Sequence, residues 1–240
     1  MKYMGSKQRF AKELLQIILA DRQNGQAYVE PFVGGFNMIC NVPSEHGPRY
    51  ANDSNKYVVA LFKALVAGWE PPLDVTREQY ANVKTNMFDY PDYIVGYIGF
   101  CCSYSGKWFG GYAGKTNTAI GTVRDYQDES LRNIKKQCEN LKDVWFNDKS
   151  YQDLIFPDNS IIYCDPPYEG TTGYKDAFDS NLFWDWVRTQ HNKGHSVFVS
   201  EYKAPLDFEC IWEKEAKSSL SANGDIGGNK VSVERLFRIA

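Results

Sequence analysis

The chain has 240 residues and a formal net charge of −3, and 43% of its residues are hydrophobic. This length and composition fit one large domain, or one domain with a substantial insertion, and supply enough apolar residues for a core. The longest apolar runs are too short to span a membrane and no secretory signal is evident, so we expect a cytoplasmic protein rather than a membrane-embedded one.

Cysteine and histidine usage predicts no metal site. Six cysteines are scattered without CxxC spacing, beside only three histidines. This pattern indicates neither zinc ligation nor a disulfide framework, so we expect reduced thiols. The negative net charge argues only weakly against a nucleic-acid partner, because phosphate contacts need local cations rather than a positive total. The middle third supplies such cations at Lys107, Lys115, Arg124, Arg132, Lys135 and Lys136.

The first third reads as repeated strand and helix units. Apolar residues at helical spacing predict a helix over residues 7–19, and a strand follows over 27–32. A short helix should open after the glycines at 34–35. A second strand over 49–52 ends at Asp53, and Ser54-Asn55 can cap a helix that continues to Trp69. Two such units in succession indicate a parallel, doubly wound sheet.

The pattern changes after Pro71-Pro72, where strands become scarce. We expect an inserted, helical or looped subdomain over residues 73–143, between two parts of a main domain, 1–72 and 144–240. The insertion holds an unusual glycine- and aromatic-rich stretch at 104–112. Strands are predicted again at 144–146, 161–163, 196–200, 208–212 and 234–239, with a helix over 182–191.

The most informative segment is Asp165-Pro166-Pro167-Tyr168. It follows an apolar run at 160–164 that reads as a buried parallel strand, so these residues reach the carboxyl end of the sheet, where open α/β folds bind ligands. Proline has no backbone N–H, so the turn can leave carbonyl oxygens free beside the aspartate. Such paired acceptors suit an exocyclic amino group, and the tyrosine can stack on its ring. A plain strand-end turn with a capping aspartate is the alternative.

A glycine turn over residues 30–35 (EPFVGG) predicts a second part of the site. Glycines let a ligand approach the backbone, and Asp53 ends the next strand about 20 residues on, where a carboxylate can reach ribose hydroxyls. The phosphate fingerprint GxGxxG is absent. Glu30 would repel a pyrophosphate but could receive an ammonium group. A nucleoside carrying an amino acid is therefore favoured over NAD, and a tight turn with a solvated glutamate is the alternative.

Taken together, these segments resemble the Dam-like, D12 class of DNA adenine-N6 methyltransferases. Residues 2–7 (KYMGSK) are similar to the family's N-terminal cofactor motif, 30–35 to its methionine-binding motif and 165–168 (DPPY) to its catalytic motif. Residues 221–224 (SANG) and 230–236 (KVSVERL) resemble its closing segment. The motifs occur in the family's order, and the insertion lies where the family has its target-recognition domain. Phe36-Asn37 departs from the small residues usual after the glycine turn.

The resemblance implies a doubly wound, mainly parallel α/β sheet of the S-adenosylmethionine-dependent methyltransferase type, with an inserted DNA-binding subdomain. It also implies S-adenosyl-L-methionine as methyl donor and a flipped-out adenine of double-stranded DNA as substrate. Expected catalytic residues are Asp165, Pro166, Pro167 and Tyr168. Expected cofactor contacts are Tyr3, Gly5, Ser6, Lys7, Glu30, Pro31, Phe32, Gly34, Gly35, Asp53, Asp148 and Asp165. Expected DNA contacts are Lys107, Trp108, Phe109, Tyr112, Lys115, Arg124 and Asn223.

Two loops are candidates for DNA contact. The stretch from Lys107 to Tyr112 predicts a flexible tip with a cation and aromatic rings, suited to phosphate contact or to wedging into the gap that a flipped base leaves. Alternatively, Trp108 and Phe109 pack under their own loop. Residues 174, 175 and 178 (Tyr, Lys, Phe) are candidates to close over the target base.

Other functions stay open at this point. Methylation of cytosine N4 or of an RNA base would use the same acceptor pair, and a relative that binds DNA without catalysis is a further alternative. A nicotinamide-dependent dehydrogenase is disfavoured because GxGxxG is missing. We expect a monomer or weak dimer, encoded by a bacterium or phage. The recognition sequence and any accompanying restriction enzyme leave no trace in the chain.

Overall fold

The computed structural model describes residues 1–118, 121–168, 178–217 and 231–240. Its centre is a seven-stranded sheet in the order β5-β2-β1-β6-β7-β9-β8. The strands are β1 (Tyr28–Glu30), β2 (Arg49–Asn52), β5 (Val144–Asn147), β6 (Ile161–Cys164), β7 (Ser196–Glu201), β8 (Phe208–Lys217) and β9 (Val231–Ile239). Strands β5, β2, β1, β6 and β7 run parallel, and β9 and β8 extend the sheet antiparallel.

Burial explains the apolar strand sequences. The four residues of β6 are between 0% and 3% exposed, because this central strand is covered on both faces. A strand buried on both faces reads as a continuous apolar run rather than an alternating one. The parallel pairing places Val29 beside Ile162 and Ile162 beside Val197.

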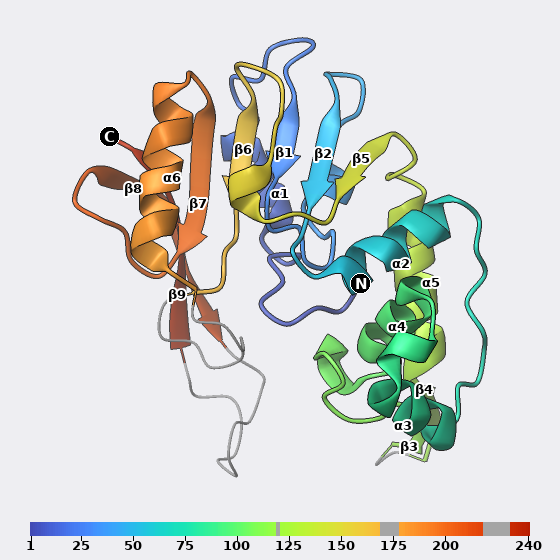
Figure 1. The fold of residues 1–240 in the computed structure, drawn as a ribbon. Coiled ribbons are helices and arrows are strands. Elements are labelled where there is room, and N and C mark those ends of the chain that lie inside the picture. The colour runs from blue at the N-terminus through green and yellow to red at the C-terminus, as the bar shows by residue number, and fades with distance from the viewer. Residues whose placement is uncertain (119–120, 169–177, 218–230) are drawn as a thin grey trace.

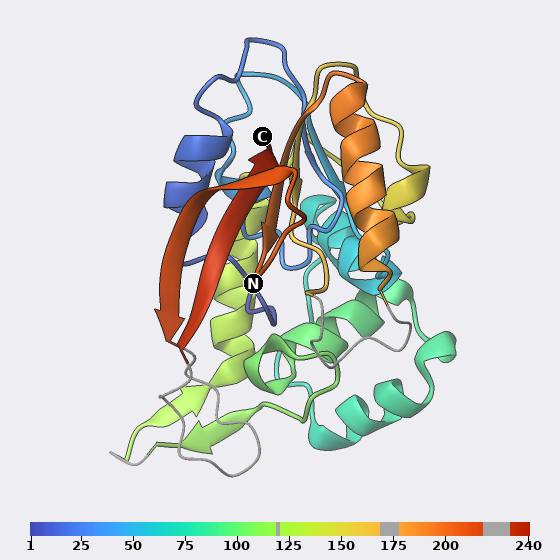
Figure 2. The ribbon, with the colours of Figure 1, turned by 90° about the vertical axis from the view of Figure 1, so that its left-hand side faces the viewer.

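Helices cover both faces of the sheet. Helices α1 (Ala11–Ile18), α2 (Lys56–Val66) and α5 (Tyr126–Cys138) contribute to one hydrophobic core, and α6 (Ser180–Asn192) packs on a second. Figure 2 shows α1 and α6 on opposite sides of the sheet. Helix α2 begins at Asn55, whose side chain accepts a hydrogen bond from the backbone of Tyr57, as the capping residues predicted. The predicted doubly wound, mainly parallel α/β fold is confirmed.

Two local predictions need correction. The helix expected over residues 7–19 begins only at Ala11. The segment after the glycine turn forms turns and one 3₁₀ turn, η1 (Ile39–Asn41), instead of a short α-helix.

The insertion leaves the sheet after α2 and returns at β5. It contains a two-stranded antiparallel hairpin, which the sequence did not predict. Its core is continuous with that of the sheet, because Tyr97 and Ile134 of the insertion lie in the same buried cluster as Phe62 of α2. The division at residues 73–143 stays a prediction. The elements are α3 (Arg77–Thr85), η2 (Met87–Asp89), α4 (Asp92–Gly96), a π-helical turn η3 (Tyr97–Cys101), η4 (Tyr104–Gly106), β3 (Lys115–Asn117), β4 (Val123–Asp125) and α5.

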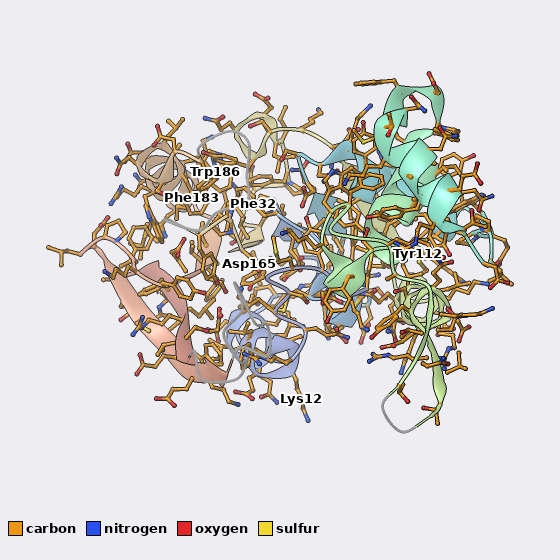
Figure 3. All side chains as sticks on the ribbon, turned by 90° about the horizontal axis from the view of Figure 1, so that it is seen from below. Lys12, Phe32, Tyr112, Asp165, Phe183 and Trp186 are labelled. Carbon is orange, nitrogen blue, oxygen red and sulfur yellow. The ribbon has the colours of Figure 1, made fainter. Side chains whose placement is uncertain are left out.

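The carboxyl ends of the parallel strands face a region that lies between the β8–β9 hairpin and the insertion. The β8–β9 hairpin and the insertion extend beyond this edge of the sheet, one on each side (Figure 1). Seen from that end, Asp165 lies between the insertion, which carries Tyr112, and the α6 side, which carries Phe183 and Trp186 (Figure 3). Among the helices in the described ranges, none is long and apolar enough to cross a membrane. The same ranges contain no group of three His, Cys, Asp or Glu side chains arranged to hold a metal ion.

Candidate active site

Acidic residues from four neighbouring strands meet at the carboxyl edge of the sheet. Glu30 ends β1, Asp53 follows β2, Asp148 follows β5 and Asp165 follows β6. Because these strands are parallel neighbours, their ends lie at one edge, as the sequence predicted. Asp148 is exposed on the outermost strand, whereas Glu30 is 2% exposed.

Lys7 connects the N-terminal motif to the DPPY motif. Its side chain is 6% exposed, and its ammonium lies 2.9 Å from Asp165 Oδ1 and 3.4 Å from Glu234 Oε2. It also donates to the carbonyl of Gly5, at 3.1 Å. Burial would lower the pKa of Lys7, but the attraction of Asp165 and Glu234 outweighs it and the pKa is raised. Lys7 is therefore a buried cation that holds Asp165, and its expected contact with the cofactor stays a prediction.

Opposing effects act on Asp165. Burial raises the pKa of its carboxyl group, and the charge of Glu234 raises it further, while Lys7 and the side chain of Tyr168 lower it. The net result is a raised pKa. The next residue, Pro166, is buried, and neither it nor Pro167 has a backbone N–H. The turn thus presents acceptors, with one carboxylate oxygen of Asp165 held by Lys7.

Tyr168 is fixed by three neighbours. Its hydroxyl donates to Glu234 Oε2 at 3.2 Å. The Lys7 ammonium lies over its ring, 4.6 Å from the centroid, and Tyr202 makes an edge contact at 4.6 Å. Burial and the nearby carboxylates raise the pKa of Tyr168 well above its usual value, so the hydroxyl remains a donor.

Glu30 is a buried carboxyl group at the end of β1. Tyr28, which is fully buried, donates a hydrogen bond to Glu30 Oε1 at 2.8 Å. Burial raises the pKa of Glu30 to about 8; the Tyr28 hydrogen bond opposes this rise, and the charge of Asp165 adds to it. A buried acid of this kind would gain from a cationic partner. Tyr28 was not identified from the sequence, because it reads as an ordinary apolar strand residue.

The glycine turn is held by Asp53 and covered by Tyr3. Asp53 accepts hydrogen bonds from the backbone N–H groups of Gly34 and Asn55, both at 2.9 Å. Burial raises the pKa of Asp53, and these two hydrogen bonds oppose the rise. A side chain at Gly35 would bring its Cβ within 2.6 Å of Tyr3 Cβ, so Tyr3 lies directly against the turn.

The remaining residues of the EPFVGG motif are packing residues in this structure. Pro31 is buried, and its carbonyl accepts a hydrogen bond from Asn52 Nδ2 at 2.9 Å. The ring of Phe32 packs against Tyr151 and Phe183, with centroids 5.1 and 5.7 Å away. Figure 3 shows Phe32 close to Phe183 and Trp186, on one side of Asp165.

The sequence departs from the family pattern at Phe36-Asn37. Here Phe36 packs in the core, and Asn37 forms hydrogen bonds to the N-terminal segment. Phe36 is fully buried in the left-handed region (φ 59°), and its ring lies 4.0 Å from that of Phe62. Asn37 Nδ2 donates to Ser6 Oγ at 2.8 Å and to the Met1 carbonyl at 3.0 Å. Asn37 therefore ties the N-terminal motif to the glycine turn, a connection that sequence reasoning missed.

The expected aromatic tip of the insertion is not exposed. Phe109 is 8% exposed, and the ring of Trp108 packs on Tyr57 and Phe100 at 5.2 and 4.7 Å. A Cβ at Gly99 would lie 2.4 Å from the Trp108 ring, so glycine is needed there. Trp108 and Phe109 are packed, as the alternative expected, but their partners lie on α2, η3 and α3 rather than within their own loop. The prediction of a flexible wedge was wrong because it ignored partners distant in sequence.

Other candidate DNA contacts differ in their surroundings. Tyr112 is half-buried and donates to the Val75 carbonyl at 2.8 Å. Lys107 is exposed, whereas Lys115 pairs with Asp74 at 2.6 Å and Arg124 with Glu129 at 2.8 Å. Residues 174, 175 and 223, also expected to contact DNA, lie outside the described residues.

The exposed aromatic residue of the glycine-rich stretch is Tyr104, which the sequence did not single out. It is 57% exposed, and its ring lies 6.3 Å from that of Tyr126. Both Lys2 and Arg124 lie over Tyr126, 5.6 and 4.5 Å from its ring centre. An exposed ring and two cations, Arg124 of the insertion and Lys2 of the N-terminal motif, therefore lie close together around Tyr126.

Several known proteins are similar to this chain. Modification methylase StsI of Streptococcus sanguinis is 24% identical over 219 residues, which cover 80% of this chain and 32% of that protein. Type II methyltransferase M.FokI of Planomicrobium okeanokoites is 26% identical, with 80% and 32% covered. The chain thus spans about a third of the length of these two relatives. Type II methyltransferase M.CviBI of Paramecium bursaria Chlorella virus NC1A is 22% identical, with 88% and 80% covered.

A structural comparison is weaker than the sequence comparisons. The tRNA (m1A58) methyltransferase TrmI from Aquifex aeolicus has a TM-score of 0.38 and 9% identity over 95% of this chain and 68% of that one, too low to support an argument. The sequence profile described as D12 class N6 adenine-specific DNA methyltransferase, by contrast, matches residues 3–206. That range includes the KYMGSK motif from Tyr3 on, the glycine turn, the insertion and DPPY. This chain therefore belongs to the D12 class N6 adenine-specific DNA methyltransferase family.

Proposed function

We propose that this protein transfers a methyl group from S-adenosyl-L-methionine to the N6 amino group of an adenine that has been flipped out of duplex DNA. The observation that carries the proposal is the DPPY motif at the carboxyl end of β6, with Asp165 held by Lys7 of the N-terminal motif. Membership of the family supports the choice of base.

The carboxyl groups at the sheet edge fit the proposed cofactor. Glu30, whose pKa is raised to about 8, can receive the ammonium of an amino-acid moiety and ionise on doing so. Asp53 accepts a hydrogen bond from the glycine turn and would accept hydrogen bonds from ribose hydroxyls there. A Cβ at Gly5 would meet nothing within 4 Å, so the N-terminal motif leaves open space there. S-adenosylmethionine would supply an electrophilic methyl group bound to a positively charged sulfur.

Asp165 and the Pro166 carbonyl activate the amino group in the proposed reaction. The N6 lone pair is delocalised into the adenine ring, so the amine is a poor nucleophile. Hydrogen bonds from its two N–H groups to these acceptors favour a more tetrahedral nitrogen and direct the lone pair at the methyl carbon. The C–N bond would form as the C–S bond breaks, the electron pair of that bond would stay on the sulfur as a neutral thioether, and N6 would release its proton to the hydrogen-bonded carboxylate of Asp165 or to water. Positioning, and acceptors placed where positive charge develops, supply most of the acceleration.

The charge of the site suits this step. Lys7 carries one positive charge between the carboxylates of Asp165 and Glu234, so the cluster of three side chains has a net negative charge when both acids are ionised. That charge favours the cationic transition state of the amine. The ring of Tyr168 can stack on the flipped base, worth roughly 1–3 kcal/mol.

The insertion is the proposed DNA-binding surface. Lys107 is exposed, and Lys2, Arg124 and Tyr104 form an exposed cationic and aromatic group around Tyr126. Lysine and arginine side chains contact phosphates, and an exposed ring can contact sugars or bases. Lys115, although paired with Asp74, is exposed and stays a candidate.

Methyl transfer from labelled S-adenosylmethionine to unmethylated genomic DNA tests the proposal. The variants are Asp165→Ala, Asp165→Asn and, as a control, Asp153→Ala, an exposed aspartate of η5 (Tyr151–Asp153). We expect N6-methyladenine from the wild type and the control, and at least about 100-fold less from both Asp165 variants. Nucleoside analysis identifies the base.

Three outcomes would contradict the proposal. N4-methylcytosine as the product would change the substrate, and methylation of RNA alone would change the nucleic acid. Undiminished activity in the folded Asp165→Asn variant would remove Asp165 from the mechanism.

A further inference from the structure

We infer that Glu234 is a positioning residue for the transfer step: through Lys7 and Tyr168 it fixes the acceptor and the ring that hold the target base. The inference rests on the proposed function and adds a residue from β9, far along the chain from the DPPY motif. Glu234 does not touch the reacting atoms itself. It acts through Lys7, which holds Asp165, and through Tyr168, which is proposed to stack on the base.

The sheet brings Glu234 to the site. Strand β9 runs antiparallel beside β7, with Arg235 opposite Glu201 at the carboxyl end of β7. Glu234 is therefore adjacent to the same edge at which β6 delivers Asp165. Its side chain is 13% exposed. Its cross-strand neighbour Lys214 pairs instead with Glu13 of α1, at 2.5 Å. The charge of Glu234 is thus directed at Lys7.

A single oxygen of Glu234 contacts both partners. Oε2 lies 3.4 Å from the Lys7 ammonium and accepts the Tyr168 hydroxyl at 3.2 Å. A shift of this carboxylate would therefore move the cation and the ring together. Because Lys7 lies over the Tyr168 ring as well, the three side chains form one contact group.

The ammonium of Lys7 has three N–H donors. The structure gives it three acceptors, Gly5 O, Asp165 Oδ1 and Glu234 Oε2. Removal of the Glu234 acceptor leaves one donor without its partner in a buried place, so the ammonium can move away from the position that orients Asp165. The effect should appear in the rate of the chemical step, since Glu30 and Asp53, the proposed cofactor ligands, remain in place.

A purely structural role for Glu234 predicts something different. In that case, variants would lose folding stability, while folded molecules would transfer methyl groups at the wild-type rate. A positioning role predicts the reverse, a slower transfer at nearly unchanged affinity for cofactor and DNA.

Single-turnover methyl transfer to duplex DNA separates the two roles. The variants are Glu234→Gln, which can still accept from Tyr168 but lacks the charge facing Lys7, and Glu234→Ala, which lacks both. The control is Glu213→Gln on β8, whose carboxylate pairs with Arg235 on the outside of the hairpin. We expect rates lower by about tenfold in Glu234→Gln and about 100-fold in Glu234→Ala, with the control near wild type.

A second measurement tests the route through Tyr168. In a Tyr168→Phe background the hydroxyl is absent, so the further loss caused by Glu234→Ala should be smaller than in the wild type. Single-turnover rates within about twofold of the control for both Glu234 variants, with unchanged affinity for cofactor and DNA, would overturn the inference while leaving the proposed function in place. A wild type that transfers no methyl group would overturn the proposed function, and this inference with it.

Discussion

The ammonium of Lys7 lies 2.9 Å from the carboxylate of Asp165, so the N-terminal motif directly holds the acid of the DPPY motif. Two segments far apart in the sequence thus form one electrostatic unit. Asp165 has a raised pKa because of its burial, and Lys7 is the main group that opposes the rise.

Replacing Lys7 by Met should slow methyl transfer and shift its pH dependence. Without the cation, only the Tyr168 side chain opposes the effects of burial and of the Glu234 charge on Asp165, so its pKa rises further. The proposed mechanism needs the ionised carboxylate, and the acid limb of the rate profile should therefore move to higher pH. We expect kcat to fall by about 100-fold near neutral pH. The measurement is kcat against pH.

Lys12→Met is the matched control, because Lys12 is an exposed residue of α1 that points away from the site (Figure 3). Its profile should match that of the wild type. Lys7→Arg keeps the charge, so its acid limb should stay in place even if its rate is lower. An unshifted profile in a folded Lys7→Met protein would contradict the role given to Lys7.

Glu30 should make the stability of the cofactor-free protein fall as pH rises. Its pKa is about 8 in the folded chain, against 4.5 for an unperturbed glutamate, so between these values the folded state binds a proton that the unfolded state releases. The stabilisation that this proton gives is complete below pH 4.5 and is lost progressively as pH rises through about 8. The free energy of unfolding should decline by up to about 1.4 kcal/mol per pH unit from this group alone.

Denaturant unfolding across this pH range tests the effect of Glu30. Relative to Glu30→Gln, the wild type should lose stability as pH rises, whereas relative to the exposed control Glu45→Gln its stability should change little. Added S-adenosylmethionine should stabilise the wild type more at the alkaline end, because an ammonium group favours the ionised glutamate. A constant difference between wild type and Glu30→Gln would show that the buried acid is not protonated.

The strand ends of the site could be predicted from the sequence, and side-chain packing around them could not. Glu30 and Asp165 end short apolar runs, and Asp53 follows the strand residues Arg49–Asn52; parallel strands place such ends together whatever the details of packing. The role of Glu234 depends on the antiparallel register of β9 beside β7, which no local pattern determines. The direct contact of Lys7 with Asp165 likewise depends on how the N-terminal segment crosses the sheet edge.

In the insertion, too, some features have a signal in the local sequence, whereas others depend on contacts between residues distant in sequence. Its hairpin has a local signal, the β-branched residues Thr116 and Val123 on either side of a turn, which the scarcity of apolar residues obscured. The burial of Trp108 has no such signal, because it depends on Tyr57 of α2 and on the absence of a side chain at Gly99. Glycine and aromatic residues in a loop predict exposure only when no core lies beneath them.

Replacing Trp108 and its neighbour Lys107 by alanine should therefore affect different properties: the first folding stability, the second DNA binding. Trp108→Ala removes a ring packed on Tyr57 and Phe100, and should lower the free energy of unfolding by about 3 kcal/mol. Lys107→Ala should leave stability unchanged but weaken DNA binding and reduce the salt dependence of log K by about one unit of slope. Thermal unfolding and fluorescence anisotropy at several salt concentrations measure the two effects; loss of stability in Lys107→Ala would contradict this assignment.

Glu129 restrains two of the cations proposed to contact DNA, so its neutralisation should strengthen binding. Its carboxylate lies 2.8 Å from both Lys2 and Arg124, and hydrogen bonds from these two residues lower its pKa. In Glu129→Gln both cations become available to phosphates and a repulsive charge is removed. We expect duplex affinity to rise a few-fold at low salt, worth about 1 kcal/mol or less, with a steeper dependence on salt.

Glu139→Gln, an exposed residue at the far end of α5, is the control for this change because it alters the net charge equally without touching either cation. Anisotropy titrations with the same duplex compare the two variants. An equal gain in both would mean that net charge alone sets the affinity. A gain confined to Glu129→Gln, and lost again when Arg124→Ala is added, would place the DNA backbone against this face of the insertion, next to the N-terminal motif that begins at Lys2.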